Sequence, residues 1–268
     1  MDLPVTPTVC PNCNATFERN YCQDCGQKRI PSNLRLRDLA LDAAHELFSL
    51  DGKLFRSLRL LAFRPGSLTQ EFIKGRRTRY VSPIRLYLLC SLVFFALLAI
   101  PSNRDSVIHG YESARAEGTT ATAHEDGTVD PNAEDRPHDA AARSAAALSL
   151  LPKAMFALMP LFAALVWLVC RRDEPYFLPH FYFSIHVHAF AFILFSLVIL
   201  IDQIPHPAAY PVALLLLFGM PAYSLVAFRR LYRHGWFRTI LKAALIGVPY
   251  LVILALTVEL VLTLTRFL

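Results

Sequence analysis

The stretch FYFSIHVHAFAFILFSLVILIDQI, residues 181–204, decides the fold class because it is apolar along most of its length and contains no lysine or arginine. An α-helix rises about 1.5 Å per residue, so a helix of this length crosses the roughly 30 Å hydrocarbon core of a bilayer. Four further blocks are apolar enough to cross in the same way, at residues 84–100, 147–170, 209–228 and 240–264. The pattern predicts an all-α membrane protein with five transmembrane helices rather than a soluble bundle.

The first block, residues 84–100, is short for a membrane span and carries polar residues at its start. Arg85 and Tyr87 are expected to extend their polar ends to the membrane interface, as long amphipathic side chains do. No secretory signal peptide is predicted ahead of this block, because paired cysteines occupy the N-terminus. Residues 84–268 are therefore predicted to form one five-span membrane domain.

Four cysteines near the N-terminus are arranged as two C-x2-C pairs separated by eight residues, Cys10 with Cys13 and Cys22 with Cys25. Each pair can supply two thiolates to one tetrahedral ion. Zinc is the expected metal for four sulfur ligands, and iron is the chemical alternative. Gly26 can take the positive φ that turns backbone N–H groups toward sulfur. A closed four-cysteine site usually builds structure, so residues 1–30 are predicted to form a zinc-ribbon-like head.

Positive charge alternates across the apolar blocks. Residues 28–85 carry 13 Lys/Arg against 5 Asp/Glu, whereas residues 101–146 carry 4 against 9. Basic residues return at 171–172 and 229–242 and are absent from 202–207. Because positive loops stay in the cytoplasm, the N-terminus is predicted to be cytoplasmic and the C-terminus to lie outside. A cytosolic head also keeps its cysteines reduced and free for metal.

The loop at residues 101–146 consists mainly of Ala, Thr, Asp, Glu, Gly and Ser. Such a segment cannot bury enough apolar surface to offset the entropy of ordering it, so most of the loop is expected to be disordered. His109, His124 and His138 lie there among acidic residues, and we interpret them as solvated side chains rather than as a metal site.

Residues 31–83 are predicted to form a basic, amphipathic cytoplasmic neck of three helices. Asn33 and Asp51 are expected to cap the first two helices, Pro65-Gly66 to end the second, and Ser67 to open a capping box for the third. The second helix is expected to have one apolar side, formed by Leu54, Phe55, Leu58, Leu61 and Ala62. Apolar faces with basic flanks are typical of helices that lie on an anionic inner leaflet.

Arg76, Arg77 and Arg79 are clustered near the end of this neck. They are the candidate contact for an anionic lipid headgroup or a phosphate, because basic residues near such a surface attract it. The simpler interpretation is an anchor that only fixes orientation. Nucleic acid is the least favoured partner, since no base-reading pattern accompanies the charge.

His186 and His188 lie near the cytoplasmic third of the third predicted span, and Glu259 lies toward the outer half of the last. Ionisable residues at membrane depth are costly and are therefore functional candidates. Residues i and i+2 point about 200° apart on a helix, so the two histidines are not expected to bind one ion. Tyr182 is the expected hydrogen-bond partner of His186. Buried neutral histidine, a proton or substrate contact and a metal ligand remain alternatives, and depth argues against an acid–base pair with Glu259.

A series of short motifs follows the cysteines. They are HE (45–46), DG (51–52), RPG (64–66), FIKGRR (72–77), YVSP (80–83), FSIHVHAF (183–190) and RRLY (229–232). Together with the cysteine pairs, they resemble a bacterial family of integral membrane proteins, domain of unknown function 3667. The resemblance covers nearly the whole chain except the acidic loop. It implies a zinc-ribbon-like head on an inner-membrane domain and brings no activity, substrate or catalytic residues.

The sequence favours a role other than catalysis. It contains no nucleophile motif and no nucleotide fingerprint, and its 10 glycines form no phosphate-binding loop. The favoured function is a membrane adaptor or assembly factor, in a bilayer with anionic headgroups, whose zinc head binds a cytosolic protein or reports to the membrane domain. The alternative is a small transporter or lipid-acting protein that uses His186, His188 and Glu259. A continuous polar cavity is expected for the alternative, and a dry bundle with an exposed head for the adaptor.

Overall fold

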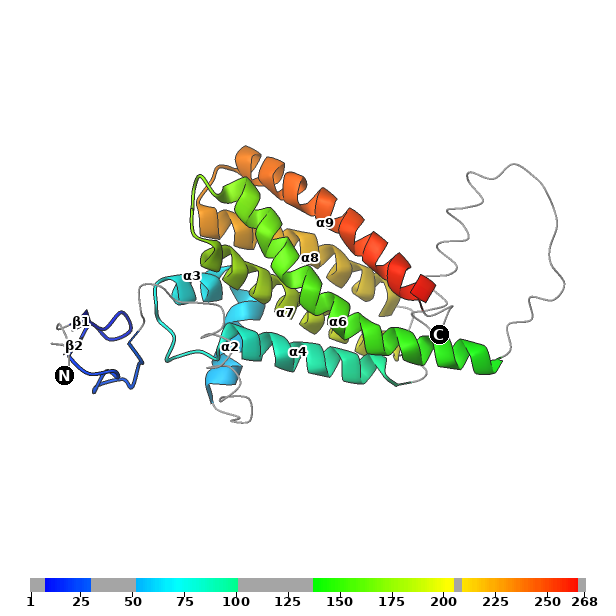
Figure 1. Cartoon of the computed structure of the whole chain (residues 1–268), viewed down its shortest axis with the longest axis horizontal. Coiled ribbons are helices and arrows are strands. Elements are labelled where there is room, and N and C mark those ends of the chain that lie inside the picture. The colour runs from blue at the N-terminus through cyan, green and yellow to red at the C-terminus, as the bar shows by residue number, and fades with distance from the viewer. Residues whose placement is uncertain (1–7, 30–51, 101–136, 205–208, 265–268) are drawn as a thin grey trace.

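The computed structural model of the protein describes residues 8–29, 52–100, 137–204 and 209–264, and only the backbone of residues 137–148. Within these ranges five long helices form one bundle (Figure 1): α4 (Pro83–Leu98), α6 (Pro137–Cys170), α7 (Phe177–Asp202), α8 (Ala209–Tyr232) and α9 (Trp236–Leu264). Two shorter helices, α2 (Gly52–Phe63) and α3 (Ser67–Ile73), lie at one end of the bundle, beside the N-terminal head. We call this the head end.

The predicted helix beginning at Asn33, the cap at Asp51 and the loop at residues 101–136 lie outside the described residues. Helix α6 begins at Pro137, ten residues inside the loop that the composition predicts to be disordered. The sequence of this first part explains the difference. Proline is pre-organised for the first helical position, and the alanine-rich residues 140–147 have the highest helix propensity.

Four helices within the described residues are long and apolar enough to cross a bilayer, namely α7, α8, α9 and the part of α6 from Ser149 to Cys170. Helix α4 is apolar but has only 16 residues, or about 24 Å at 1.5 Å per residue. The chain is therefore a multi-pass helical membrane protein, and the structure confirms four of the five predicted spans as candidates. The fifth is not confirmed.

Helix α7 is the centre of the bundle. It contacts α4, α6 and α8 along its length and α2 and α3 at the head end. Its apolar sequence has no polar face, and 67% of its most apolar window is buried, compared with 11% for α9. On α8, Leu215 and Phe218 are each 72% exposed. Apolar surface of this extent is unusual on soluble proteins and matches contact with lipid.

Helix α2 is oriented so that its polar residue Ser57 faces the protein interior, which the apolar pattern does not predict. The Ser57 hydroxyl donates to the Lys53 carbonyl at 2.8 Å and accepts the Val81 N–H at 3.0 Å. Ser57 and Leu61 are the buried residues of the helix, and Phe55 is 72% exposed. The predicted apolar side is therefore only partly covered by protein: Leu54, Leu58 and Leu61 pack on the core, and Phe55 remains at its exposed edge.

The turn between α2 and α3 ends α2 as predicted, but α3 begins differently. Gly66 is the N-cap of α3, with a φ of 76° and no side-chain cap. The predicted capping box is wrong, because the Ser67 hydroxyl instead accepts a hydrogen bond from Arg230 Nη1 at 2.8 Å. A charged donor on α8 makes a stronger bond than the backbone N–H of a helix start.

Helix α3 packs on protein rather than on a lipid leaflet. Its buried residues, Leu68, Thr69 and Phe72, face α7 and α8. The Phe72 ring lies 5.8 Å from the Tyr182 ring and 5.7 Å from the His186 ring, measured between centroids. The apolar face that the sequence assigns to the membrane surface is therefore part of the protein core at the head end.

Arg85 and Tyr87 at the start of α4 are also buried, at 3% and 1% exposure. The prediction that they extend to the membrane interface was wrong. The Tyr87 ring packs edge-on against Phe156 and Phe192, at centroid distances of 5.4 and 5.5 Å. The Tyr87 side chain therefore points toward α6 and α7, and Arg85, two residues earlier on the helix, is buried as well.

Candidate metal centre and intramembrane polar residues

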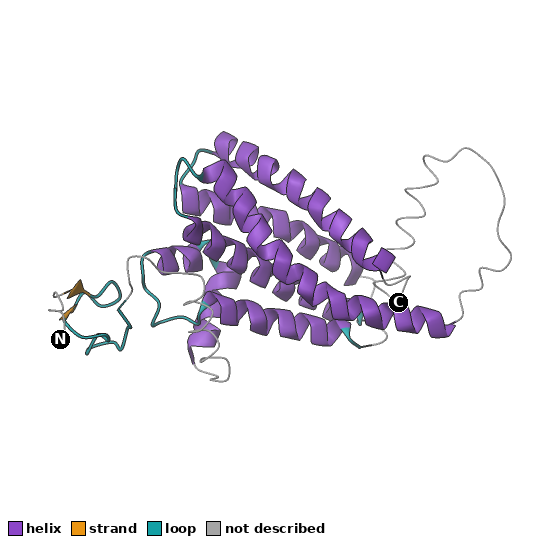
Figure 2. Cartoon of the chain, in the orientation of Figure 1, coloured by secondary structure: helices purple, strands orange, loops and turns teal. Residues whose placement is uncertain are grey.

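The N-terminal head contains two turns with the same hydrogen-bond pattern, one for each cysteine pair. Strands β1 (Thr8–Val9) and β2 (Thr16–Phe17) pair antiparallel around the first turn (Figure 2), and a single antiparallel bridge between Tyr21 and Lys28 closes the second. In the first turn, the Cys10 N–H donates to the Ala15 carbonyl and the Asn14 N–H donates to the Cys10 carbonyl, both at 2.8 Å.

The second turn has the same pattern, with 2.9 Å bonds from the Cys22 N–H to the Gln27 carbonyl and from the Gly26 N–H to the Cys22 carbonyl. Asn14 and Gly26 occupy equivalent positions with φ values of 64° and 70°. The predicted positive φ of Gly26 is therefore confirmed. Asparagine is among the few other residues that adopt this conformation readily.

The two turns bring the four cysteines together. Their Sγ atoms all lie within 4.8 Å of one another, with 3.6 Å between Cys10 and Cys25 and 3.5 Å between Cys13 and Cys22. Four sulfurs bound at about 2.3 Å around a tetrahedral ion lie roughly 3.8 Å apart, so the arrangement fits a metal ion. All four cysteines are free thiols. The predicted ligand set therefore has a geometry that could hold a metal ion.

The environment of Cys25 favours the thiolate that a metal needs. Burial opposes ionisation, but hydrogen bonds from the Asn12 side chain and the Gln27 backbone outweigh it and lower the pKa of Cys25 to about 7. Donors that point at sulfur stabilise its charged form. The thiolate is therefore favoured at Cys25, whereas the pKa of Cys13 in the other turn is raised to about 12.

Gln27 attaches the head to the membrane domain. Its Nε2 donates to the Gly75 carbonyl at 2.7 Å, and its Oε1 accepts from the Arg77 N–H at 3.3 Å and from the Thr78 hydroxyl at 3.0 Å. Gln27 is only 4% exposed, and its carbonyl holds the Cys22 N–H. Sequence reasoning missed this contact, although the glutamine lies only two residues after Cys25.

The predicted arginine cluster does not form one site. Arg76 Nη1 lies 3.5 Å from Glu71 Oε1, and the Arg77 guanidinium stands over the Tyr182 ring at 5.8 Å from its centroid. Arg79 is exposed. Arg76 therefore forms an ion pair, Arg77 a cation–π contact, and Arg79 lies on the surface. The three side chains do not converge on one position where an anion could bind.

His186 and His188 of α7 bind three different partners. His186 Nδ1 lies 2.9 Å from the Thr69 hydroxyl of α3, so the expected partner Tyr182 was wrong. His188 Nδ1 faces the Ser184 carbonyl at 2.8 Å and must donate to it, which leaves Nε2 to accept from the Tyr250 hydroxyl at 2.7 Å. The two residues point to different helices, as their spacing predicts.

His180 joins the loop after α6 to the end of α8. Its Nε2 lies 2.9 Å from the Glu174 carbonyl and therefore donates, and its Nδ1 accepts from the Tyr232 hydroxyl at 2.5 Å. In the same loop Asp173 forms an ion pair with Lys242 of α9, and His234 Nε2, in the loop before α9, lies 3.3 Å from the same carboxylate. Burial opposes ionisation of Asp173, but these partners outweigh it and lower its pKa. Each of these contacts stabilises the head end.

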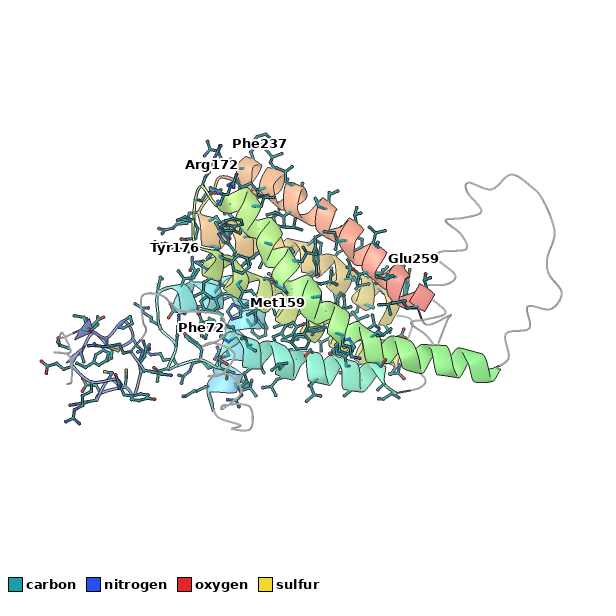
Figure 3. The ribbon with its side chains drawn as sticks, viewed as in Figure 1. Phe72, Met159, Arg172, Tyr176, Phe237 and Glu259 are labelled. Atoms are coloured by element: carbon teal, nitrogen blue, oxygen red, sulfur yellow. The ribbon has the colours of Figure 1, made fainter. Side chains whose placement is uncertain are left out.

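Glu259 is far from the histidines. In Figure 3, Phe237 lies near one end of α9 and Glu259 near the other. Glu259 follows Tyr250 by nine residues, or about 13 Å along the helix axis. A cavity of about 860 Å³ between the helices is lined almost entirely by apolar side chains. His188 and Tyr250 line it, whereas His186 and Glu259 do not. The described residues therefore form no continuous polar cavity that joins the three candidates.

The fold and the cysteine site together define a class: a multi-pass helical membrane protein with a four-cysteine head. The model of a family described as Protein of unknown function (DUF3667) matches residues 51–95. This match covers α2, α3 and most of α4, and it confirms in that segment the family resemblance that the motifs indicate. No curated protein and no solved structure matches the chain.

Proposed function

We propose that this protein is a membrane adaptor or assembly factor whose metal-bearing head binds a cytosolic protein. The observation that carries the proposal is the way the head is held. Gln27 attaches it to the loop at residues 75–78, while Val9 and Tyr21 remain 60% and 56% exposed. Exposed apolar and aromatic side chains on a small rigid module are suited to protein binding.

Zinc is the metal that we assign to the head. Four thiolates in a closed tetrahedral arrangement are a structural zinc site. The ion would tie the two turns together in a module whose described residues form a two-residue strand pair and one isolated bridge. The metal would therefore supply folding free energy to the head rather than take part in a reaction.

We further infer that α4 is a fifth span and that the head lies in the cytoplasm of a bacterial inner membrane. Leu92 and Val93 of α4 are 66% and 55% exposed, as expected for a lipid-facing side. The chain enters the bundle at the head end through α4, and α9 ends at the opposite end (Figure 1). Arg171 and Arg172 directly follow α6, and Arg229 and Arg230 lie in the last turn of α8. Both pairs lie at the head end, which agrees with a cytoplasmic position for that end because positive loops stay in the cytoplasm.

Reporter fusions test this topology. A reporter fused after Leu268 is expected to be active outside the cytoplasm, and one that replaces residues 1–30 is expected to be active inside, because an odd number of spans separates them. If both reporters were active on the same side of the membrane, the number of spans would have to be even, and α4 would not be a membrane span.

The transporter alternative receives less support. It needs His186, His188 and Glu259 in one polar cavity, but His186 is bound to α3, His188 to α9, and Glu259 lies near the far end of α9. The hydrogen bonds of the histidines join helices, which is the role of satisfied polar groups in a bundle core.

Crosslinking followed by purification from membranes tests the adaptor role. We expect one cytosolic protein to be retained in a fixed ratio by the natural chain and lost from the double variant Val9→Ser/Tyr21→Ser, because truncation of interface anchors is costly. The matched control is Glu18→Ser/Gln23→Ser, which changes two exposed polar residues of the head. Metal content confirms that both heads are folded. Equal retention by both variants, or no retained protein, would reject the proposal.

A further inference from the structure

We propose that a second basic site, a pocket along α2, binds the phosphate group of a membrane lipid headgroup. The pocket has a volume of about 470 Å³. It is lined by Arg56, Arg59, Leu60, Phe63, Arg64 and Tyr80. None of these arginines belongs to the cluster at residues 76–79, and the inference does not depend on the adaptor role of the head.

The geometry of α2 produces this pocket. Arg56, Arg59 or Leu60, and Phe63 recur at the spacing of one helix face, so their side chains lie side by side along α2. Arg64 follows directly after the helix, and Tyr80 comes from the segment that leads into α4. The hydrogen-bonded Ser57 fixes the rotation of α2 and therefore directs this face away from the core.

The charge of the pocket is not neutralised within the described residues. No ion pair joins Arg56, Arg59 or Arg64 to a described carboxylate, whereas Arg76 pairs with Glu71. Guanidinium groups at this spacing repel one another, and an anion between them relieves that repulsion. The planar donor fork of arginine matches the oxygens of a phosphate in a bidentate manner. A phosphate group is therefore the ligand that the lining chemistry favours.

The surroundings favour a lipid as the source of the phosphate. Phe63 lines the pocket and is 80% exposed, and Phe55 on the same helix is 72% exposed. Tyr80 lies three residues before Pro83, where the apolar helix α4 begins. A pocket with cationic walls, an aromatic rim and a membrane helix beside it suits a headgroup phosphate together with the adjoining glycerol and acyl carbons.

Titration of the purified full chain in detergent with short-chain phosphatidylglycerol, followed by native mass spectrometry, tests the site. The pocket variant is Arg56→Gln/Arg59→Gln/Arg64→Gln. The matched control is Arg171→Gln/Arg172→Gln/Arg238→Gln, which removes three exposed positive charges from the same end of the bundle. We expect about tenfold weaker lipid binding by the pocket variant and less than about twofold by the control, because a built site depends on geometry.

Two further arms separate the remaining outcomes. Inorganic phosphate in millimolar excess is expected to leave the lipid bound. If phosphate displaced the lipid, the pocket would still bind phosphate, but its ligand would be a soluble phosphate compound and the lipid assignment would be wrong. A triple Arg→Lys variant of the pocket keeps the charge and is expected to lose about threefold in affinity, since lysine lacks the bidentate fork. Equal weakening in the pocket and control variants would overturn the site. Natural affinity in the lysine variant would also overturn it, even if the glutamine variant failed to fold.

Discussion

Replacement of Gly66 by alanine is expected to destabilise the head end of the bundle strongly. Gly66 has a φ of 76°, and a Cβ added there would lie 2.7 Å from the Ala227 carbonyl oxygen and 3.1 Å from its Cα. The left-handed conformation alone costs a residue with a Cβ about 1–2 kcal/mol. The overlap adds to this cost, because backbone atoms inside α8 cannot rotate away as a side chain can.

The consequence reaches beyond the turn itself. The same region is joined to α8 by the hydrogen bond from the Tyr223 hydroxyl to the Leu61 carbonyl and by that from Arg230 Nη1 to the Pro65 carbonyl, both at 2.7 Å. Displacing the Gly66 backbone strains both bonds. Thermal unfolding of the detergent-solubilised protein is therefore expected to begin at a temperature several degrees lower in the alanine variant.

Two other glycines provide the controls for this experiment. Gly26 has a φ of 70° but open space around an added Cβ, so Gly26→Ala tests the dihedral cost without the overlap. Gly52 has neither a positive φ nor a neighbouring atom within 4 Å, so Gly52→Ala is expected to be neutral. A melting temperature for Gly66→Ala no lower than that for Gly52→Ala would contradict the close approach of the turn to α8.

The double replacement Cys10→Ser/Cys13→Ser is expected to abolish metal binding while the membrane helices stay inserted. The natural chain is expected to carry about one zinc ion, because its four thiols converge on one tetrahedral position. Removing one pair leaves two ligands, which cannot close a structural site. Elemental analysis of protein purified without chelators measures the loss, and membrane fractionation measures insertion.

The matched control for the metal prediction is Cys90→Ser/Cys170→Ser. These two cysteines are buried in the helical bundle, away from the head. The control removes the same number of thiols and is expected to keep the full metal content. A natural chain without zinc or iron, or an equal metal loss in the control, would end the assignment of the head as a metal centre.

The sequence by itself determined the features that depend on spacing along the chain. Residues 181–202 lie in a helix of spanning length, α7, because a long apolar stretch has no other stable form in a bilayer. Two C-x2-C pairs bring four sulfurs together because each pair closes its own tight turn. The divergence of His186 and His188 follows from the 100° rotation per helical residue. All of these are local rules.

The tertiary structure alone decided the contacts between distant segments. His186 binds Thr69, 117 residues away, instead of the nearby Tyr182. Ser57 faces the interior because Val81 supplies a donor, and this rotation lines up the arginines of the α2 pocket. Periodicity ranks residues by polarity, so it placed the polar end of Arg85 at the membrane interface and gave no reason to bury Ser57. Which polar group is buried depends on the partner that folding brings to it, and a single sequence does not specify that partner locally.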